Sequence, residues 1–177
     1  MVDLAEIQAV YYMVAATGVL VAAVFYILNL RVSQRNMKAN LETRQAQLFM
    51  QSFNLWLTSG MIENYLELFQ QDWKTYEEWV EKYGMKNNPK AALIYFKLDT
   101  FFEGIGVLVK RKLVDPWLVD EFMSSDIISY WEKMRPVAEG IRKQQGRETW
   151  AENSEYLYDE VLKVYKQQHP DLVAPPP

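Results

Sequence analysis

The chain of 177 residues contains no cysteine and carries 19 Lys and Arg against 23 Asp and Glu, a net charge of −4. The missing cysteines exclude disulfides, thiolate metal sites, iron–sulfur clusters and cysteine nucleophiles. The acidic balance gives no support to non-specific nucleic-acid binding. Half of the residues are apolar, which is enough for the core of one domain with an appendage.

The first predicted element is a transmembrane helix. Residues 7–30 carry no charge, and a helix of that length rises about 36 Å, enough for a hydrocarbon core of about 30 Å. Aromatic residues that favour the bilayer interfaces flank this stretch: Tyr11, Tyr12, Phe25 and Tyr26. We assign residues 9–30 to the span and residues 1–8 to a short external N-terminus. A signal peptide, which normally begins with cations, and a buried soluble helix are the alternatives.

Basic residues follow the apolar stretch and none precede it. Arg31, Arg35, Lys38 and Arg44 lie directly after it, whereas residues 1–30 contain only Asp3 and Glu6 as charged residues. The positive-inside rule therefore predicts a single-pass protein of the cell membrane, with its N-terminus outside and its C-terminal domain cytoplasmic. We expect Arg31, Arg35 and Lys38 to lie at the membrane surface beside anionic head groups.

Three small residues share one face of the predicted span: Ala15, Gly18 and Ala22. Small residues at this spacing let two helices approach closely, which favours a homo-oligomer or contact with a partner's transmembrane helix. The alternative is that they reflect the ordinary composition of membrane helices.

The remaining sequence predicts an all-α fold, a juxtamembrane helix over residues 31–57 that continues into a cytoplasmic helical bundle over residues 58–168. Leu41, Leu48 and Leu55 lie seven residues apart, and so do Glu42, Phe49 and Trp56. Three leucines are too few for a coiled coil. Packing of this helix onto the domain is the better interpretation.

Residues that cap or break helices predict the boundaries of the other helices. The juxtamembrane helix is expected to end at Thr58–Gly60, and a second helix follows. A third helix begins after Thr75, where Glu78 completes a capping box, and ends at Gly84. Pro89 opens a fourth helix, whose apolar residues recur at helical spacing: 91, 94, 98, 101, 105 and 108.

After the fourth helix the chain restarts with Asp115 as a helix cap and Pro116 at the first helical position. A further helix is expected from about Ser124–Asp126, with a kink or break after Arg135 because Pro136 follows. The last helix is expected over residues 149–168. A disordered, Pro-rich tail is expected over residues 169–177.

Few residues suit catalysis or metal binding. The one histidine, His169, lies at the expected end of the last helix, and no P-loop or nucleophile elbow is present. Asp99 and Glu103 share one helical face, where two carboxylates could hold a hard cation. We expect them instead to pair with a Lys or Arg of the next helix, such as Arg135 or Arg142, or to lie in solvent. No cofactor and no metal are therefore predicted.

The glycines of Gly104-Ile105-Gly106 do not follow a strand and lack the third glycine of a dinucleotide-binding loop. We interpret them as a place where helices pack closely, with Trp131 or Trp117 against the bare backbone beside Phe101 and Phe102. On this interpretation Gly106→Leu destabilises the domain.

Residues 100–119 and 130–142 resemble an uncharacterised prokaryotic family of membrane-anchored proteins, known as a domain of unknown function. The resemblance covers roughly residues 5–165 and rests on the following features: Phe101-Phe102-Glu103, Gly106, Val107-Leu108-Val109, Lys110-Arg111, Tyr130-Trp131 and Arg135-Pro136. It implies one N-terminal transmembrane helix and a helical cytoplasmic domain. It implies no activity.

Two functions remain open at this point. The first is a non-enzymatic interaction module anchored in the lipid bilayer, an accessory or regulatory subunit of a membrane-associated complex. The second is an enzyme or small-ligand binder with a pocket in the helical domain formed by Glu103, Tyr130, Arg135 and Arg142.

Overall fold

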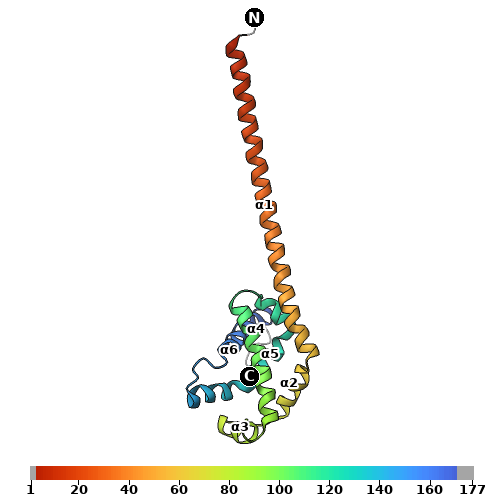
Figure 1. The fold of residues 1–177 in the computed structure, drawn as a ribbon, viewed down its shortest axis with the longest axis vertical. Helices are drawn as coiled ribbons and strands as arrows, with labels where there is room; N and C mark the ends of the chain where they lie inside the picture. The colour runs from red at the N-terminus through yellow and green to blue at the C-terminus, as the bar shows by residue number, and fades with distance from the viewer. Residues whose placement is uncertain (1–2, 171–177) are drawn as a thin grey trace. The chain divides into compact units, whose positions relative to one another are not determined.

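The computed structural model describes residues 3–170, and these residues form six α-helices and no strand (Figure 1). The helices are α1 (Leu4–Thr58), α2 (Met61–Gln70), α3 (Tyr76–Tyr83), α4 (Pro89–Lys110), α5 (Pro116–Gln145) and α6 (Glu152–Gln168). The predicted all-α class is confirmed. The chain divides after Arg44 into two units: the N-terminal segment (residues 3–44) and the helical domain (residues 45–170).

The N-terminal segment belongs to α1, and every one of its side chains is exposed. Within the described residues, α1 is the one helix that is long and apolar enough to cross a membrane. Signal sequences and the core helices of soluble proteins can have the same length and composition, but core helices are mostly buried, whereas none of the apolar stretch of α1 is buried.

Residues 45–58 of α1 belong to the helical domain and pack through aromatic side chains. Phe49 and Trp56 are buried, whereas Leu55 is exposed. Leu48 packs half-buried against the same core. The contact with the domain therefore uses Phe49 and Trp56 from one heptad and Leu48 from the other. The ring of Trp56 lies 5.3 Å from that of Phe101 on α4.

Two helices begin with the side-chain caps that the sequence predicts. Thr75 Oγ1 accepts a hydrogen bond from the Glu78 backbone N–H at 3.3 Å, at the start of α3. Asp115 Oδ1 accepts one from the Trp117 N–H at 3.0 Å, with Pro116 as the first residue of α5. Each cap satisfies a backbone donor that the first turn of a helix leaves unpaired.

The core of the helical domain lies around α4, which packs against α2 and α6, while α5 packs against α6 (Figure 1). The predicted apolar stripe of α4 supplies much of this core, since Ala91, Ile94, Leu98 and Ile105 are buried. α3 lies against α4 and α5. This arrangement brings the middle of α4 next to the first turn of α6, where the candidate site lies.

Two expectations for α5 are wrong. The helix does not begin near Ser124, and it does not break after Arg135, because α5 runs without interruption from Pro116 to Gln145. A proline inside a helix removes one backbone hydrogen bond and costs about 3 kcal/mol. Buried residues on both sides of Pro136 hold the two halves against one core: Met134, Val137, Ala138 and Ile141.

The last helix begins at Glu152, three residues later than expected. The α5–α6 loop (residues 146–151) starts with Gly146 at φ 65° and ends with Ala151 at φ 55°. Both residues adopt the left-handed conformation, which is unusual for alanine. Residues 171–177, most of the predicted tail, lie outside the described residues.

Candidate functional site

A polar cleft of about 460 Å³ opens between α4 and the α5–α6 loop. Asp99 and Glu103 line it from α4, and the loop lines it with residues 146–151. Of the four residues predicted to form a pocket, Glu103 lines the cleft. Tyr130 does not line it but hydrogen-bonds to Asp99, which does.

Asp99 is the buried acidic group of this cleft, with only 8% of its surface exposed. The Tyr130 hydroxyl, itself buried, donates to Asp99 Oδ1 at 3.5 Å. Burial raises the pKa of Asp99 from its ordinary value of 3.8 to about 7, and the charge of Glu103 adds to this rise. The hydrogen bond from Tyr130 and the charge of Arg142 act in the opposite direction. Asp99 can therefore exchange a proton near neutral pH.

An aromatic pair joins the loop to α4. Trp150 Nε1 donates a hydrogen bond of 2.7 Å to the hydroxyl of Tyr95, which is buried. The guanidinium of Arg147 lies 5.2 Å above the ring of Trp150. The loop is therefore fastened to α4 one turn before Asp99.

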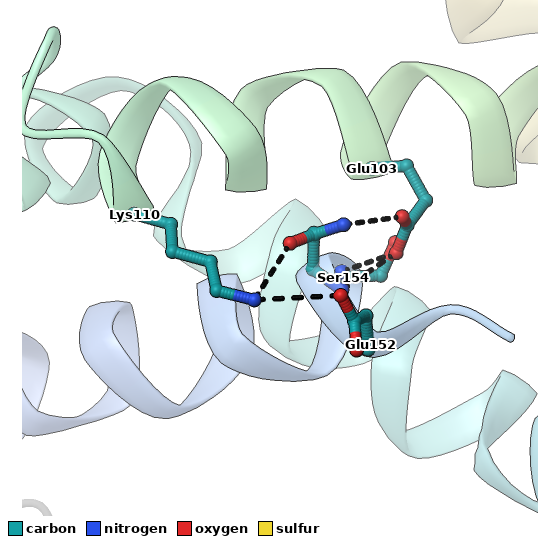
Figure 2. Close-up of polar contacts among 5 residues, drawn as sticks. Glu103, Lys110, Glu152 and Ser154 are labelled. Atoms are coloured by element: carbon teal, nitrogen blue, oxygen red, sulfur yellow. Dashed lines mark hydrogen bonds and ion pairs between the residues drawn. The ribbon is translucent and has the colours of Figure 1, made fainter. Parts of the chain in front are cut away.

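Glu103 lies at the side of the cleft, and its carboxylate caps α6 (Figure 2). Its Oε1 accepts from the backbone N–H groups of Asn153 at 2.8 Å and Ser154 at 2.7 Å. Its Oε2 accepts from Asn153 Nδ2 at 2.9 Å. The N-cap residue of α6 is Ala151, whose methyl group accepts no hydrogen bond. A carboxylate fifty residues earlier therefore performs the role of an N-cap side chain.

Lys110 extends this network along the same face of α4 (Figure 2). Its Nζ donates to Asn153 Oδ1 at 3.2 Å and pairs with Glu152 Oε1 at 3.4 Å. The Asn153 amide is thus held at both ends, by Glu103 and by Lys110.

The two glycines of the sequence motif differ in their surroundings. A Cβ placed on Gly106 would lie 2.6 Å from the Asn153 carbonyl carbon and closer still to its oxygen, so the bare backbone lets α6 approach. The neighbour is the backbone of α6, and not the indole of Trp131 or Trp117. Gly104 faces open space, with nothing within 4 Å of such a Cβ, so the packing predicted there is absent.

The expected pairing of Asp99 and Glu103 with an arginine is wrong. Arg142 donates through Nε to the Trp150 carbonyl at 2.7 Å, and its Nη1 pairs with Glu155 Oε2 at 2.8 Å. Arg135 lies outside the cleft, with its guanidinium 5.3 Å from the ring of Tyr158. Glu103 accepts hydrogen bonds from backbone N–H groups instead. Among residues 3–170, Asp99 has no cation in hydrogen-bond contact.

The other predicted residues divide between the two units. The residues assigned to the span and the membrane surface are all exposed on α1: Tyr11, Tyr12, Ala15, Gly18, Ala22, Phe25, Tyr26, Arg31, Arg35 and Lys38. In the helical domain Phe102 and Trp131 are buried, and Phe101 is half-buried against Trp56.

Tyr95, Arg147 and Trp150 are residues of the cleft region that the sequence did not indicate. The sequence predicts a helix that includes residues 149 and 150, and a helical assignment gives no sign of a loop contact. No spacing rule links Tyr95 to Trp150, because the two come together only through the packing of α4 on the loop. The capping role of Glu103 was missed for the same reason.

Removing the Glu103 carboxylate should destabilise the domain. Glu103→Ala leaves the Asn153 and Ser154 N–H groups without their acceptor, which should cost about 2–3 kcal/mol. Thermal unfolding of the full chain in detergent, followed by circular dichroism, measures this loss. Glu152→Ala is the matched control, because it removes an exposed ion pair beside the same helix start and should cost less than about 1 kcal/mol. Equal losses in both variants would show that the cap has no special role.

The described residues are all-α, and their first helix is a candidate membrane span. In the helical domain, Glu103 and Gly106 of α4 contact Asn153 of α6. The profile of one protein family, described as a domain of unknown function (DUF4760), matches residues 13–161. The chain belongs to this family, which agrees with the resemblance to an uncharacterised family noted from the sequence. No curated protein and no solved structure shows a significant match to the chain.

Proposed function

We propose that the protein is a membrane-anchored interaction module, an accessory or regulatory subunit of a membrane-associated complex. The observation that carries this proposal is the apolar stretch of α1, which is long enough to cross a bilayer and has none of its surface buried. Exposing some 24 apolar and uncharged residues to water is unfavourable at about 25 cal/mol per Å² of apolar surface. A bilayer removes that cost.

The charges beside the stretch support one orientation. Arg31, Arg35 and Lys38 are exposed on α1 directly after it, and cations of this kind are retained on the cytoplasmic side. The helical domain is then cytoplasmic, with the N-terminus outside.

Membrane insertion and orientation can be tested in one set of experiments. The natural chain has no cysteine, so Asp3→Cys and Lys38→Cys each introduce a single thiol. Alkaline carbonate should leave the full chain in the membrane. An impermeant maleimide added to intact cells should label the Asp3→Cys variant and not the Lys38→Cys variant. Release by carbonate, or a mature N-terminus within residues 15–35 by mass spectrometry, would refute the anchor.

The partner is tested separately on gently solubilised membranes. Blue-native electrophoresis should show the protein in a complex larger than its own micelle. Migration at the monomer mass alone would refute an interaction module.

A small-ligand binder is the second candidate, and the cleft beside Asp99 supports it. This carboxyl is buried, and its one hydrogen bond to the described part of the chain is long at 3.5 Å. A thermal-shift screen of metabolites and metal ions at pH 6 and pH 8 should find ligands whose effect disappears in Asp99→Asn. Consistent null results at both pH values would remove this candidate.

A further inference from the structure

One carboxylate oxygen in the cleft has no partner within the helical domain. Asp99 lines the cleft from α4 with only 8% of its surface exposed. Its Oδ1 accepts the long hydrogen bond from Tyr130, whereas its Oδ2 has no hydrogen-bond partner among residues 3–170. Buried polar groups are almost always hydrogen-bonded, and an ionised carboxylate without a partner is costly to bury. A molecule that enters the cleft can supply the missing donor.

The charges around the cleft favour a positively charged molecule. Among the described residues that line it, three carry carboxylates and one carries a guanidinium: Asp99, Glu103, Glu148 and Arg147. An anion in the cleft would meet this negative excess at close range, whereas a cation would be attracted by it.

The bonding of Glu103 disfavours a metal ion. Its two oxygens already accept three hydrogen bonds, from N–H groups of Asn153 and Ser154 (Figure 2). Ca²⁺ takes about six to eight oxygen ligands, and Mg²⁺ requires near-octahedral geometry. Within residues 3–170 no three Asp, Glu, His or Cys side chains are grouped to hold a metal. An ammonium group needs only hydrogen-bond acceptors, and one ionised carboxylate gives it a charge-assisted bond.

Trp150 forms an aromatic wall of the cleft and already holds a cation. Its indole is fixed by the hydrogen bond to Tyr95, and the guanidinium of Arg147 lies 5.2 Å from its ring. Aromatic faces attract cations. Arg147 is exposed, so its side chain can move aside for a ligand. The cleft of about 460 Å³ lies in the size range of small-molecule sites, about 300–1,000 Å³.

We propose that the cleft binds a small organic cation whose primary ammonium group donates to Asp99 Oδ2 while its carbon chain lies against Trp150. The inference rests on the second candidate function, a small-ligand binder, and it names the class of ligand. It does not depend on the membrane anchor.

Thermal unfolding of the full chain in detergent tests the ligand class with three probes of equal length. At pH 8, where Asp99 is ionised, n-butylamine should raise the melting temperature with increasing dose, whereas n-butanol and butyrate should not. Asp99→Asn keeps the shape of the side chain and removes its charge, so it should weaken the affinity for n-butylamine about tenfold or more. Asp159→Asn removes an exposed charge on α6 and should leave that affinity unchanged.

Arg147→Gln distinguishes a cationic from an anionic ligand. It removes a cation that competes for the face of Trp150, so the affinity for n-butylamine should rise about threefold. A lower affinity in Arg147→Gln, or an affinity that is unchanged in Asp99→Asn, would overturn the proposal.

The same measurements separate this inference from the function on which it rests. If butyrate or a metal ion stabilises the natural chain but not Asp99→Asn, and n-butylamine stabilises neither, the ammonium class is refuted and the small-ligand binder remains. If no compound gives a shift that depends on Asp99, both are refuted.

Discussion

Gly106→Ala should lower the melting temperature of the helical domain, and Gly104→Ala should raise it. The added methyl group at position 106 would lie 2.6 Å from the Asn153 carbonyl carbon, so α6 has to move away from the Glu103 carboxylate. We expect a loss of about 3 kcal/mol, or roughly 6–12 °C for a chain of this size. At position 104 the methyl group meets open space, and replacing an interior helix glycine by alanine gains about 0.5–1 kcal/mol.

The two variants make a matched pair, because they add the same methyl group two residues apart on one helix. Thermal unfolding of the full chain in detergent, with circular dichroism at 222 nm, gives both shifts. Shifts of the same sign would contradict the packing of α6 on Gly106. The sequence alone predicts a loss for Gly106→Leu, but it does not distinguish the two glycines.

Asp99→Asn should make the domain more stable at pH 8 than the natural chain, and this difference should shrink steadily as the pH falls to 5. The pKa of Asp99 is about 7 in the folded state against 3.8 ordinarily, so the folded state binds more protons than the unfolded state between these values. Stability is therefore present at low pH and is lost as pH rises towards 7. Between pH 5 and pH 7 the loss is about 1.4 kcal/mol per pH unit, or about 3 kcal/mol in all.

Comparing the stability of Asp99→Asn with that of the natural chain at each pH separates the effect of the Asp99 carboxyl from that of the other titrating groups. Asp159→Asn removes the same charge at an exposed position and should stay within about 0.5 kcal/mol of the natural chain. Tyr130→Phe removes the hydrogen bond that lowers the pKa of Asp99, so the loss of stability should extend to higher pH. A constant difference between Asp99→Asn and the natural chain from pH 5 to pH 8 would refute the assignment.

Much of the fold could be predicted because its signals are local. Thr75, Asp115 and Pro89 are residues whose side chains or rings act within one helical turn, and each begins or caps a helix as predicted. The predicted break at Pro136 is wrong, because burial of residues on both sides of the proline outweighs the lost backbone hydrogen bond. Helix propensity alone does not include this burial energy.

The candidate site could be predicted only in part. The spacing of Asp99 and Glu103 places both on one face of α4, and both line the cleft. The partners of Glu103 could not be predicted, because they are backbone N–H groups of α6, and every residue type except proline carries such a group. Gly140 was missed for a similar reason. A Cβ there would lie 2.7 Å from Tyr76 Cδ1 and closer to the rest of that side chain.

The cap that Glu103 places on α6 also sets an order of events during protein synthesis. The acceptor is made fifty residues before its donors at Asn153, which at 5–20 residues per second is roughly 3–10 s. Throughout that interval the face of α4 that later receives α6 has no α6 to cover it. Closure of the helical domain must therefore wait until α6 has been translated.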